Sequence, residues 1–515
     1  MAVENVPGKK TVKYRMVLPA ADVSRRFEGF SKQRANLKSW EAAELEMHPQ
    51  GGWGFPSHVS EEIKSKREMV GQRVARGTLN AFLMPKTRTA EEVRDLLKAA
   101  GNPLAFIGKL RLFDITGSSN DLPSWQVAFN RKVLAREVDF RDRFGSWTKG
   151  FPTLSACCST MPVRLEIRYS DKPNSIVFHN LAYGKAPLEW DFDAKPSVPI
   201  AGPENEGMDL APFFILGNYY GLRGIEVISH PTSPIAKCGG LESSNAFIYG
   251  LNWLGNVLSG AGLGQAEIFS TSVFHANYVL GDLTGGQGMS AMMEGGYHTF
   301  HYMIPAGMNG YISQEVVTPE HYGAIYSHID LVQPGKDFSA HDGRSAADIN
   351  NGWCAALTTP EGFDEQSRIP ELAIEFARAL NTASEGDENA WKEAARLARA
   401  QVAIRVNRGP KYLQGNEEFV KHVEDGGGAA FALGAGGPGA MFAVLGPAGL
   451  IQEVRGREGL IPITEQVAIE VLRSNGKLKG YIDYEIDKVG MEHEGVEEAG
   501  FGPIPVMPLE VNIDI

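Results

Sequence analysis

Cysteine is scarce in this sequence, which excludes several kinds of site. Four cysteines occur among 515 residues, and two of them, Cys157 and Cys158, are adjacent. That number and spacing provide neither a disulfide framework nor the cysteine pairs of a structural zinc site. We therefore expect a protein of a reducing, cytoplasmic setting.

An excess of basic residues is also missing. Lysine and arginine total 50 against 62 aspartates and glutamates, a net charge of −12. Non-specific binding to nucleic acid needs a basic surface, so nucleic acid is not an expected partner. The uncharged stretch Gly426–Ile451 carries nine glycines and two prolines, which indicates loop and strand rather than a membrane span. Met1–Tyr14 lacks the apolar core of a signal peptide, so no membrane association is expected.

The length of the chain predicts more than one domain. A chain of 515 residues exceeds one ordinary core, and 43% hydrophobic with 22% charged residues is typical of a globular protein. We expect a partly helical N-terminal extension (1–130), a subdomain with a phosphate loop (131–310) and a second subdomain with a tail (311–515). Patterning and capping signals predict helices over 89–100, 243–259, 265–280, 371–380 and 389–406.

Glycine, by contrast, is abundant, with 58 residues. Three glycine-rich, uncharged clusters stand out: Cys238–Phe247, Thr284–Ala291 and Leu433–Met441. Glycines let backbone N–H groups converge on an anion, and a helix that begins there adds its dipole. The first cluster leads directly into the helical pattern at 243–259, whereas the second is expected to be a loop over 284–296.

Together, the order of the clusters resembles the GHMP superfamily of small-molecule kinases. Gly240–Asn245 resembles the family's G-L-G-S-S-A phosphate loop, and Gly434–Gly439 resembles its C-terminal G-A-G-G-G-G segment. Gly285–Gly296 resembles the G-x-Q-D-Q-x-A-A-A-x-G-G segment of the fucose and heptose kinase branch. Phe144–Lys149 resembles that branch's A-G-G-W-T-D substrate motif, and the resemblance spans roughly residues 135 to 450.

The resemblance implies an α+β fold of two subdomains, here with an N-terminal and a C-terminal extension. It implies transfer of a phosphoryl group from ATP, with Mg²⁺, to a hydroxyl of a sugar or sugar derivative. The implied partner is a small, sugar-like substrate, which one interpretation makes anionic. Formation of a homo-oligomer stays open. The implied magnesium ligands are Ser244 and Glu242. The residues implied at the nucleotide are Gly239, Gly240, Glu242, Ser243, Ser244, Asn245, Gly434, Gly436 and Gly437.

Several departures from the family pattern bear on the chemistry. The family's catalytic aspartate falls on Gly288, its magnesium-binding glutamate on or near Ala276, and its sugar-binding aspartate on Lys149, while Glu242 replaces a glycine of the phosphate loop. Loss of a general base removes a factor of about 10² to 10⁴ in rate. We expect Lys149 to contact the acceptor, and Asp282, Glu294 or Glu242 to replace the missing carboxylates. We also expect Gly288→Asp to raise turnover if the surrounding geometry is family-like.

Simpler interpretations stand beside these. Ser243 and Ser244 are also suited to capping a helix, and Glu242 to a favourable charge at its start. His275 is more typical of a packed histidine than of a ligand, and Lys149 of a solvated lysine. The alternative to a kinase is a relative of the same fold without catalytic activity, which binds an anionic ligand or has a structural or assembly role. Sequence alone leaves both open.

Overall fold

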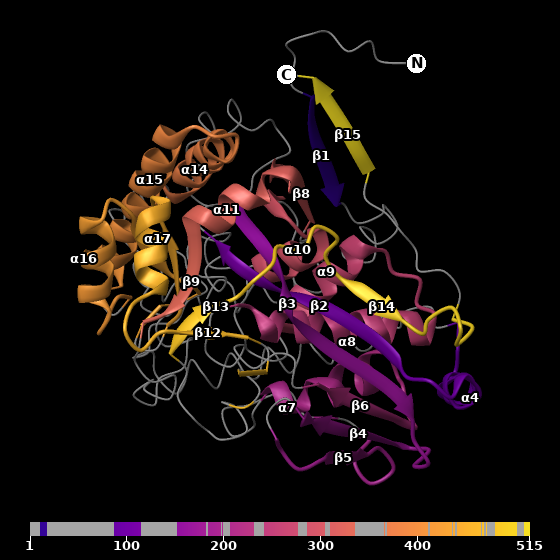
Figure 1. The fold of residues 1–515 in the computed structure, drawn as a ribbon. Coiled ribbons are helices and arrows are strands. Elements are labelled where there is room, and N and C mark those ends of the chain that lie inside the picture. Colours follow the sequence, from indigo (N-terminus) through magenta and orange to yellow (C-terminus); the bar gives the residue numbers. More distant parts are fainter. Residues whose placement is uncertain are drawn as a thin grey trace, which may run out of the picture.

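A computed structural model of the chain provides the structure. It describes residues 11–17, 87–114, 152–181, 184–196, 198, 207–230, 241–276, 286–303, 310–334, 365, 368–409, 412–434, 436–437, 440–464, 466–467, 470, 479–501 and 509–514. The architecture is α+β, as predicted, with a large and a small β-sheet and helices packed on both (Figure 1).

The large sheet collects strands from across the whole chain. The described strands have the order β15-β1-β8-β7-β3-β6-β4-β5, with β2 paired to β3 and β14 paired to β2. Every pair is antiparallel except β4 with β6. The bounds are β1 Thr11–Val17, β2 Leu104–Asp114, β3 Pro152–Tyr169, β4 Ser175–Asn180, β5 Leu188–Asp191, β6 Ile225–Ser229, β7 Tyr297–Met303, β8 Gly310–Val317, β14 Glu492–Glu494 and β15 Leu509–Asp514.

Three helices that follow the first and second glycine clusters pack against this sheet. They are α8 (Ser243–Ser259), α9 (Gln265–Phe274) and α10 (Gln287–Glu294). The expected helix over 243–259 is confirmed, but it is buried on nearly all sides rather than on one face. The second cluster is not wholly the loop that was expected, because α10 occupies most of it. Its small residues and glycines conceal a helical period from sequence analysis.

Close approach of α8 to the sheet depends on a glycine. A Cβ atom on Gly250 would lie 2.5 Å from Phe106 of β2 and 2.7 Å from Leu165 of β3. The Phe106 ring also packs against Trp253, with ring centroids 5.7 Å apart. This packing fixes the start of α8 relative to β2, the strand that carries Arg111.

The small sheet has the order β10-β11-β9-β13-β12. Helix α14 packs against β3, β8 and α15, and α15 packs against β10 (Figure 1). The predicted helices over 371–380 and 389–406 are confirmed as α14 and α15. The bounds of these elements are β9 Ile329–Gln333, β10 Ala429–Ala432, β11 Phe442–Leu445, β12 Ile461–Ile463, β13 Gly480–Ile482, α11 Tyr322–His328, α14 Ile369–Ser384, α15 Glu388–Arg408, α16 Glu417–Asp425 and α17 Ala448–Arg455.

The large sheet crosses the expected region boundaries. Strand β2 lies within the expected extension 1–130, and β8, β14 and β15 lie beyond residue 310. Figure 1 shows β1 and β15, from opposite ends of the chain, side by side as a ribbon. The hydrogen-bonded sheet thus continues across residues 130 and 310. The division of the chain into three regions at these residues remains a proposal.

Helix α4 (Ala90–Ala100) begins as the sequence predicts. The Thr89 hydroxyl accepts from the Glu92 N–H, the Glu92 carboxylate accepts from the Thr89 N–H at 2.7 Å, and Gly101 ends the helix in the left-handed conformation. This reciprocal capping satisfies two backbone donors at the helix start. Among the described helices, none is both long and apolar enough to cross a membrane.

Candidate functional site

The start of α8 has an unusual backbone. Glu242 immediately precedes the helix with φ 64° and ψ 31°, and it is the one non-glycine residue with positive φ in the described part of the chain. The left-handed conformation costs a residue with a Cβ atom about 1 kcal/mol or more. The Glu242 carbonyl accepts from Ala246 N at 3.0 Å, the first bond of the helix. The strained residue therefore sets the direction in which α8 begins.

The Glu242 side chain does not cap the helix. Its Oε1 lies 3.4 Å from Nη1 of Arg111, whose side chain is fully buried, and only 8% of the Glu242 side chain is exposed. Asn245 Nδ2 donates to Glu242 Oε2. The Arg111 N–H also donates to the Leu241 carbonyl at 3.1 Å. The sequence suggested either a magnesium ligand or a favourable charge at the helix start. Neither describes Glu242 fully, because its carboxylate forms a buried ion pair with Arg111 of β2.

Gly288, in the first turn of α10, lies directly against Glu242. A Cβ atom built on Gly288 would be 2.3 Å from the Cβ and 2.6 Å from the Cγ of Glu242. A side chain at 288 would collide with the part of Glu242 nearest its backbone, so the geometry around Gly288 does not accommodate Gly288→Asp alone, and its effect on turnover stays a prediction. The same contact brings the first turns of α8 and α10 together, so the positive ends of two helix dipoles lie near the Glu242 side chain.

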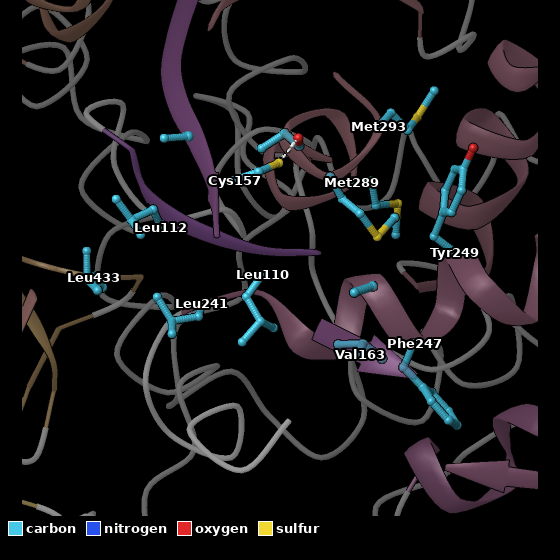
Figure 2. Packing of buried hydrophobic residues seen from close by; sticks show 14 of the residues in the cluster. Leu110, Leu112, Cys157, Val163, Leu241, Phe247, Tyr249, Met289, Met293 and Leu433 are labelled. Carbon is cyan, nitrogen blue, oxygen red and sulfur yellow. Dashed lines mark hydrogen bonds between the residues drawn. The ribbon is translucent and has the colours of Figure 1, made fainter. Parts of the chain in front are cut away.

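Helix α10 is fixed to the large sheet by two further contacts. The Cys157 thiol of β3 donates to the Ala291 carbonyl (Figure 2). A Cβ atom on Gly108 of β2 would lie 2.7 Å from Met292 Sδ. These contacts fix the position of α10, and therefore of Gly288, relative to strands β2 and β3.

The predicted phosphate-binding side chains follow Glu242 in the first turn of α8. Ser243 and Asn245 are buried, and Ser244 is partly exposed. The first backbone N–H groups of any helix have no acceptor within that helix. An anion at this turn would meet those N–H groups and the Ser244 hydroxyl together.

The third glycine cluster is the hairpin loop between β10 and β11. Gly434, Gly436 and Gly437 have φ of 63°, 76° and 93°, which glycine adopts without strain. Buried Arg405 of α15 donates from Nη1 to the Gly434 carbonyl at 3.3 Å and to the Tyr412 hydroxyl at 3.0 Å. Gly437 N donates to the Tyr412 carbonyl at 2.8 Å. Arg405 and Tyr412 thus hold the loop in place through hydrogen bonds to its backbone.

The first two clusters meet, as the Glu242–Gly288 contact establishes. The third is linked to them through the core: Leu241 of the first cluster and Leu433 of the third belong to one group of buried hydrophobic residues (Figure 2). Convergence of all three clusters on one ligand remains a prediction.

The remaining predicted residues lie elsewhere or outside the described part of the chain. Glu294 is buried at the other end of α10, about 9 Å along the helix from Gly288 at 1.5 Å per residue. Burial of the Tyr249 hydroxyl raises the pKa of Tyr249, and the negative charge of Glu294 raises it further. The predictions for Lys149, Asp282, Gly239 and Gly240 fall on residues that are not described.

His275 is a packed histidine, as the simpler interpretation holds. Burial lowers its pKa from 6.5 to about 3, so the ring is neutral. Its Nδ1 lies 2.9 Å from Asn252 Oδ1, which accepts the hydrogen bond. The ring makes an edge contact with Tyr219 at 4.5 Å between centroids. Its neighbour Ala276 is fully buried and offers no metal ligand.

These residues fit the phosphates of a nucleotide better than a dedicated magnesium site. The start of α8 and the serine hydroxyls suit an anion. Magnesium is usually held by one or two carboxylates and by phosphate oxygens. Of the two implied ligands, Ser244 is partly exposed but Glu242 is engaged with Arg111. In the described residues, no three His, Cys, Asp or Glu side chains are grouped to hold a metal.

Sequence reasoning missed Arg111 and Arg405. Arg111 had a signal: Lys109 and Arg111 lie two apart in an otherwise apolar run, which places two cations on one face of a strand. Lys109 pairs with Asp487 and Glu492, at 3.2 Å each. Arg405 carried no such signal, because it sits in a helix with many charges.

Comparison with known proteins gives a likeness of fold. No family model and no curated protein matches the sequence. The Lin0012 protein of Listeria innocua is 10% identical, with a TM-score of 0.50 over 76% of this chain and 99% of that one. Lactococcus lactis galactokinase complexed with galactose is 12% identical (TM-score 0.47; 79% and 98% covered), and Methanococcus jannaschii mevalonate kinase is also 12% identical (TM-score 0.45; 70% and 96% covered). The likeness to these solved structures is one of fold.

Proposed function

We propose that this protein is an ATP-dependent small-molecule kinase of the GHMP type, which transfers the γ-phosphoryl group to a hydroxyl of a sugar or sugar derivative. The observation that carries the proposal is the meeting of the α8 and α10 first turns at Glu242 and Gly288. This arrangement joins two of the three glycine clusters in one place. It supports a site for a group that carries several negative charges.

The nucleotide phosphates are assigned to the first turn of α8. Backbone N–H groups there, together with the Ser243 and Ser244 hydroxyls, would bind phosphate oxygens, and the loop at Gly434, Gly436 and Gly437 would complete the site. Catalysis of phosphoryl transfer depends mostly on position and on neutralisation of charge. The close contact of the α8 start with α10, with Glu242 paired to buried Arg111, supports a fixed position for the bound nucleotide.

An anionic acceptor is the second part of the proposal. Lys149 stands where the family's sugar-binding aspartate falls. A lysine binds a carboxylate or phosphate where an aspartate binds hydroxyls. The acceptor we propose is therefore a sugar acid or sugar phosphate, with Lys149 as its contact and Asp282 as a further candidate in the acceptor site.

Isothermal titration with ATP tests the nucleotide site. We expect binding by the unaltered protein, and at least a tenfold loss of affinity in Ser243→Ala/Ser244→Ala. Ser327→Ala is the matched control, because this exposed helix serine bonds only its own helix, at Gly323 O, and should bind ATP normally. No heat of binding at millimolar ATP would instead favour a non-catalytic protein of the same fold.

A further inference from the structure

Two departures from the family pattern touch each other. A carboxylate is missing at Gly288, where the resemblance expects an aspartate, and one is gained at Glu242, where it expects a glycine. The two positions are 46 residues apart in the sequence, yet the Cβ of Glu242 occupies the space that a side chain at 288 would need, at 2.3 Å. The exchange is therefore spatially reciprocal, since the side chain lost from α10 is replaced by one from the residue before α8.

The surroundings of Glu242 hold its carboxylate in a fixed position. Arg111 approaches Oε1 at 3.4 Å, and Asn245 donates to Oε2. The guanidinium and the first turns of two helices all stabilise negative charge at this point. The side chain is nearly buried, with 8% exposed, so little conformational freedom remains to it.

Strain supports a function rather than a purely structural role. Glycine would adopt φ 64° at position 242 without cost, whereas glutamate does not. A buried ion pair is weak as a source of stability, because the desolvation of both charges offsets their attraction. The chain thus retains a strained residue and a buried pair where an unstrained glycine would fold more easily.

We propose, on the premise of the kinase function above, that Glu242 is the catalytic base and acts from the α8 side of the site. The acceptor hydroxyl oxygen forms a bond to the γ-phosphorus of ATP. The bond from that phosphorus to the β,γ-bridging oxygen breaks, and ADP leaves with the electron pair. The hydroxyl proton passes to a carboxylate oxygen of Glu242 and from there to water. Arg111 positions the carboxylate and does not exchange a proton.

The test combines three variants with two readouts. Glu242→Gln keeps the shape of the side chain but cannot accept the proton. Glu242→Gly/Gly288→Asp returns the carboxylate to α10 and removes the collision. Asp330→Asn is the matched control, because it breaks another buried acid–arginine pair, Asp330 with Arg455 at 2.9 Å, on β9 of the small sheet. ATP affinity is measured by titration. Turnover is measured as ADP release with galactose, fucose, mannose and their monophosphates over a range of pH.

We expect Glu242→Gln to bind ATP within a few-fold of the unaltered protein and to lose turnover by about 10²-fold or more. The unaltered enzyme should lose turnover as pH falls and Glu242 is protonated, and the residual turnover of Glu242→Gln should lack that acid limb. The exchange variant should recover part of the turnover, and Asp330→Asn should keep it per folded molecule.

Two results would overturn the assignment while leaving the kinase intact. One is unchanged turnover in Glu242→Gln. The other is a parallel loss of ATP affinity and turnover, which would make Glu242 a ligand of the nucleotide or its metal. Should the unaltered protein neither bind ATP nor release ADP with any of these sugars, the kinase function fails, and the role of Glu242 fails with it.

Discussion

Arg111 and Glu242 form an ion pair that joins β2 to the residue before α8, with Nη1 and Oε1 3.4 Å apart. The Arg111 side chain is fully buried, so this carboxylate balances its charge within the core. Strand β2 lies outside the region that resembles the kinase family by sequence. A residue of the expected N-terminal extension therefore takes part in the contact between the first and second glycine clusters.

The left-handed backbone at Glu242 predicts an unusual order of stability. Glu242→Gly and Glu242→Ala both remove the carboxylate and leave Arg111 without it, so that loss cancels in the comparison. Only glycine adopts φ 64° without strain, and Glu242→Gly should be the more stable variant by about 1 kcal/mol. Urea unfolding measures the difference. An alanine variant as stable as the glycine variant would show that the backbone relaxes.

The contact between Gly288 and Glu242 predicts a coupled pair of substitutions. Gly288→Ala should lower the free energy of unfolding by about 1–3 kcal/mol, because its methyl group meets Glu242 at 2.3 Å. In a Glu242→Gly background most of that loss should disappear, and a double-mutant cycle measures the coupling.

Gly323→Ala and Gly449→Ala are the controls for Gly288→Ala. Both glycines occupy the second position of a helix, as Gly288 does, and a Cβ atom on either meets nothing within 4 Å. Alanine there should be neutral or stabilise by up to about 1 kcal/mol. Equal changes in the free energy of unfolding at all three positions would contradict a collision between the new methyl group at 288 and Glu242.

Burial of His275 predicts a dependence of stability on pH. Its pKa in the folded protein, about 3, lies below the ordinary 6.5, so the unfolded chain takes up the proton first as pH falls. This contribution to stability is present above pH 6.5 and is lost progressively from there toward pH 3. Between pH 7 and pH 5, the unaltered protein should lose about 2 kcal/mol more than His275→Gln. Parallel urea midpoints across this range would contradict a buried, neutral histidine.

The swap of an aspartate for Lys149 predicts a preference among acceptors. Titration with paired neutral and phosphorylated sugars should give the tighter binding to the phosphorylated member of a pair. Lys149→Ala should remove that preference, because the attraction depends on the ammonium charge. Equal affinity for both members of each pair, unchanged in Lys149→Ala, would exclude an anionic acceptor.

Local signals in the sequence predicted local structure well. Thr89 and Glu92 predicted the start of α4, and the apolar spacing after Ser243 predicted α8 over its full length. Each of these signals lies within the element that it specifies. The α+β class followed from the resemblance that the order of the glycine clusters indicates, since the order of a family's motifs reflects its whole topology.

Relationships between distant segments could not be predicted in this way. The pairing of β1 with β15 and of β2 with β14 joins residues near opposite ends of the chain, and a strand's own sequence does not specify its partner. The Glu242–Gly288 contact is of the same kind. Each position alone was taken as a loss or a gain of charge, and only their proximity shows that one side chain fills the space of the other.

Transfer of phosphate from ATP to a sugar is the most direct test of the central claim. The unaltered protein, incubated with magnesium, ATP labelled at the γ-phosphate and the panel of neutral and phosphorylated sugars, should yield a labelled sugar product by mass spectrometry. Ser243→Ala/Ser244→Ala should yield little of it, and Ser327→Ala should yield as much as the unaltered protein. Absence of any labelled sugar, in a preparation shown to bind ATP, would contradict the kinase function.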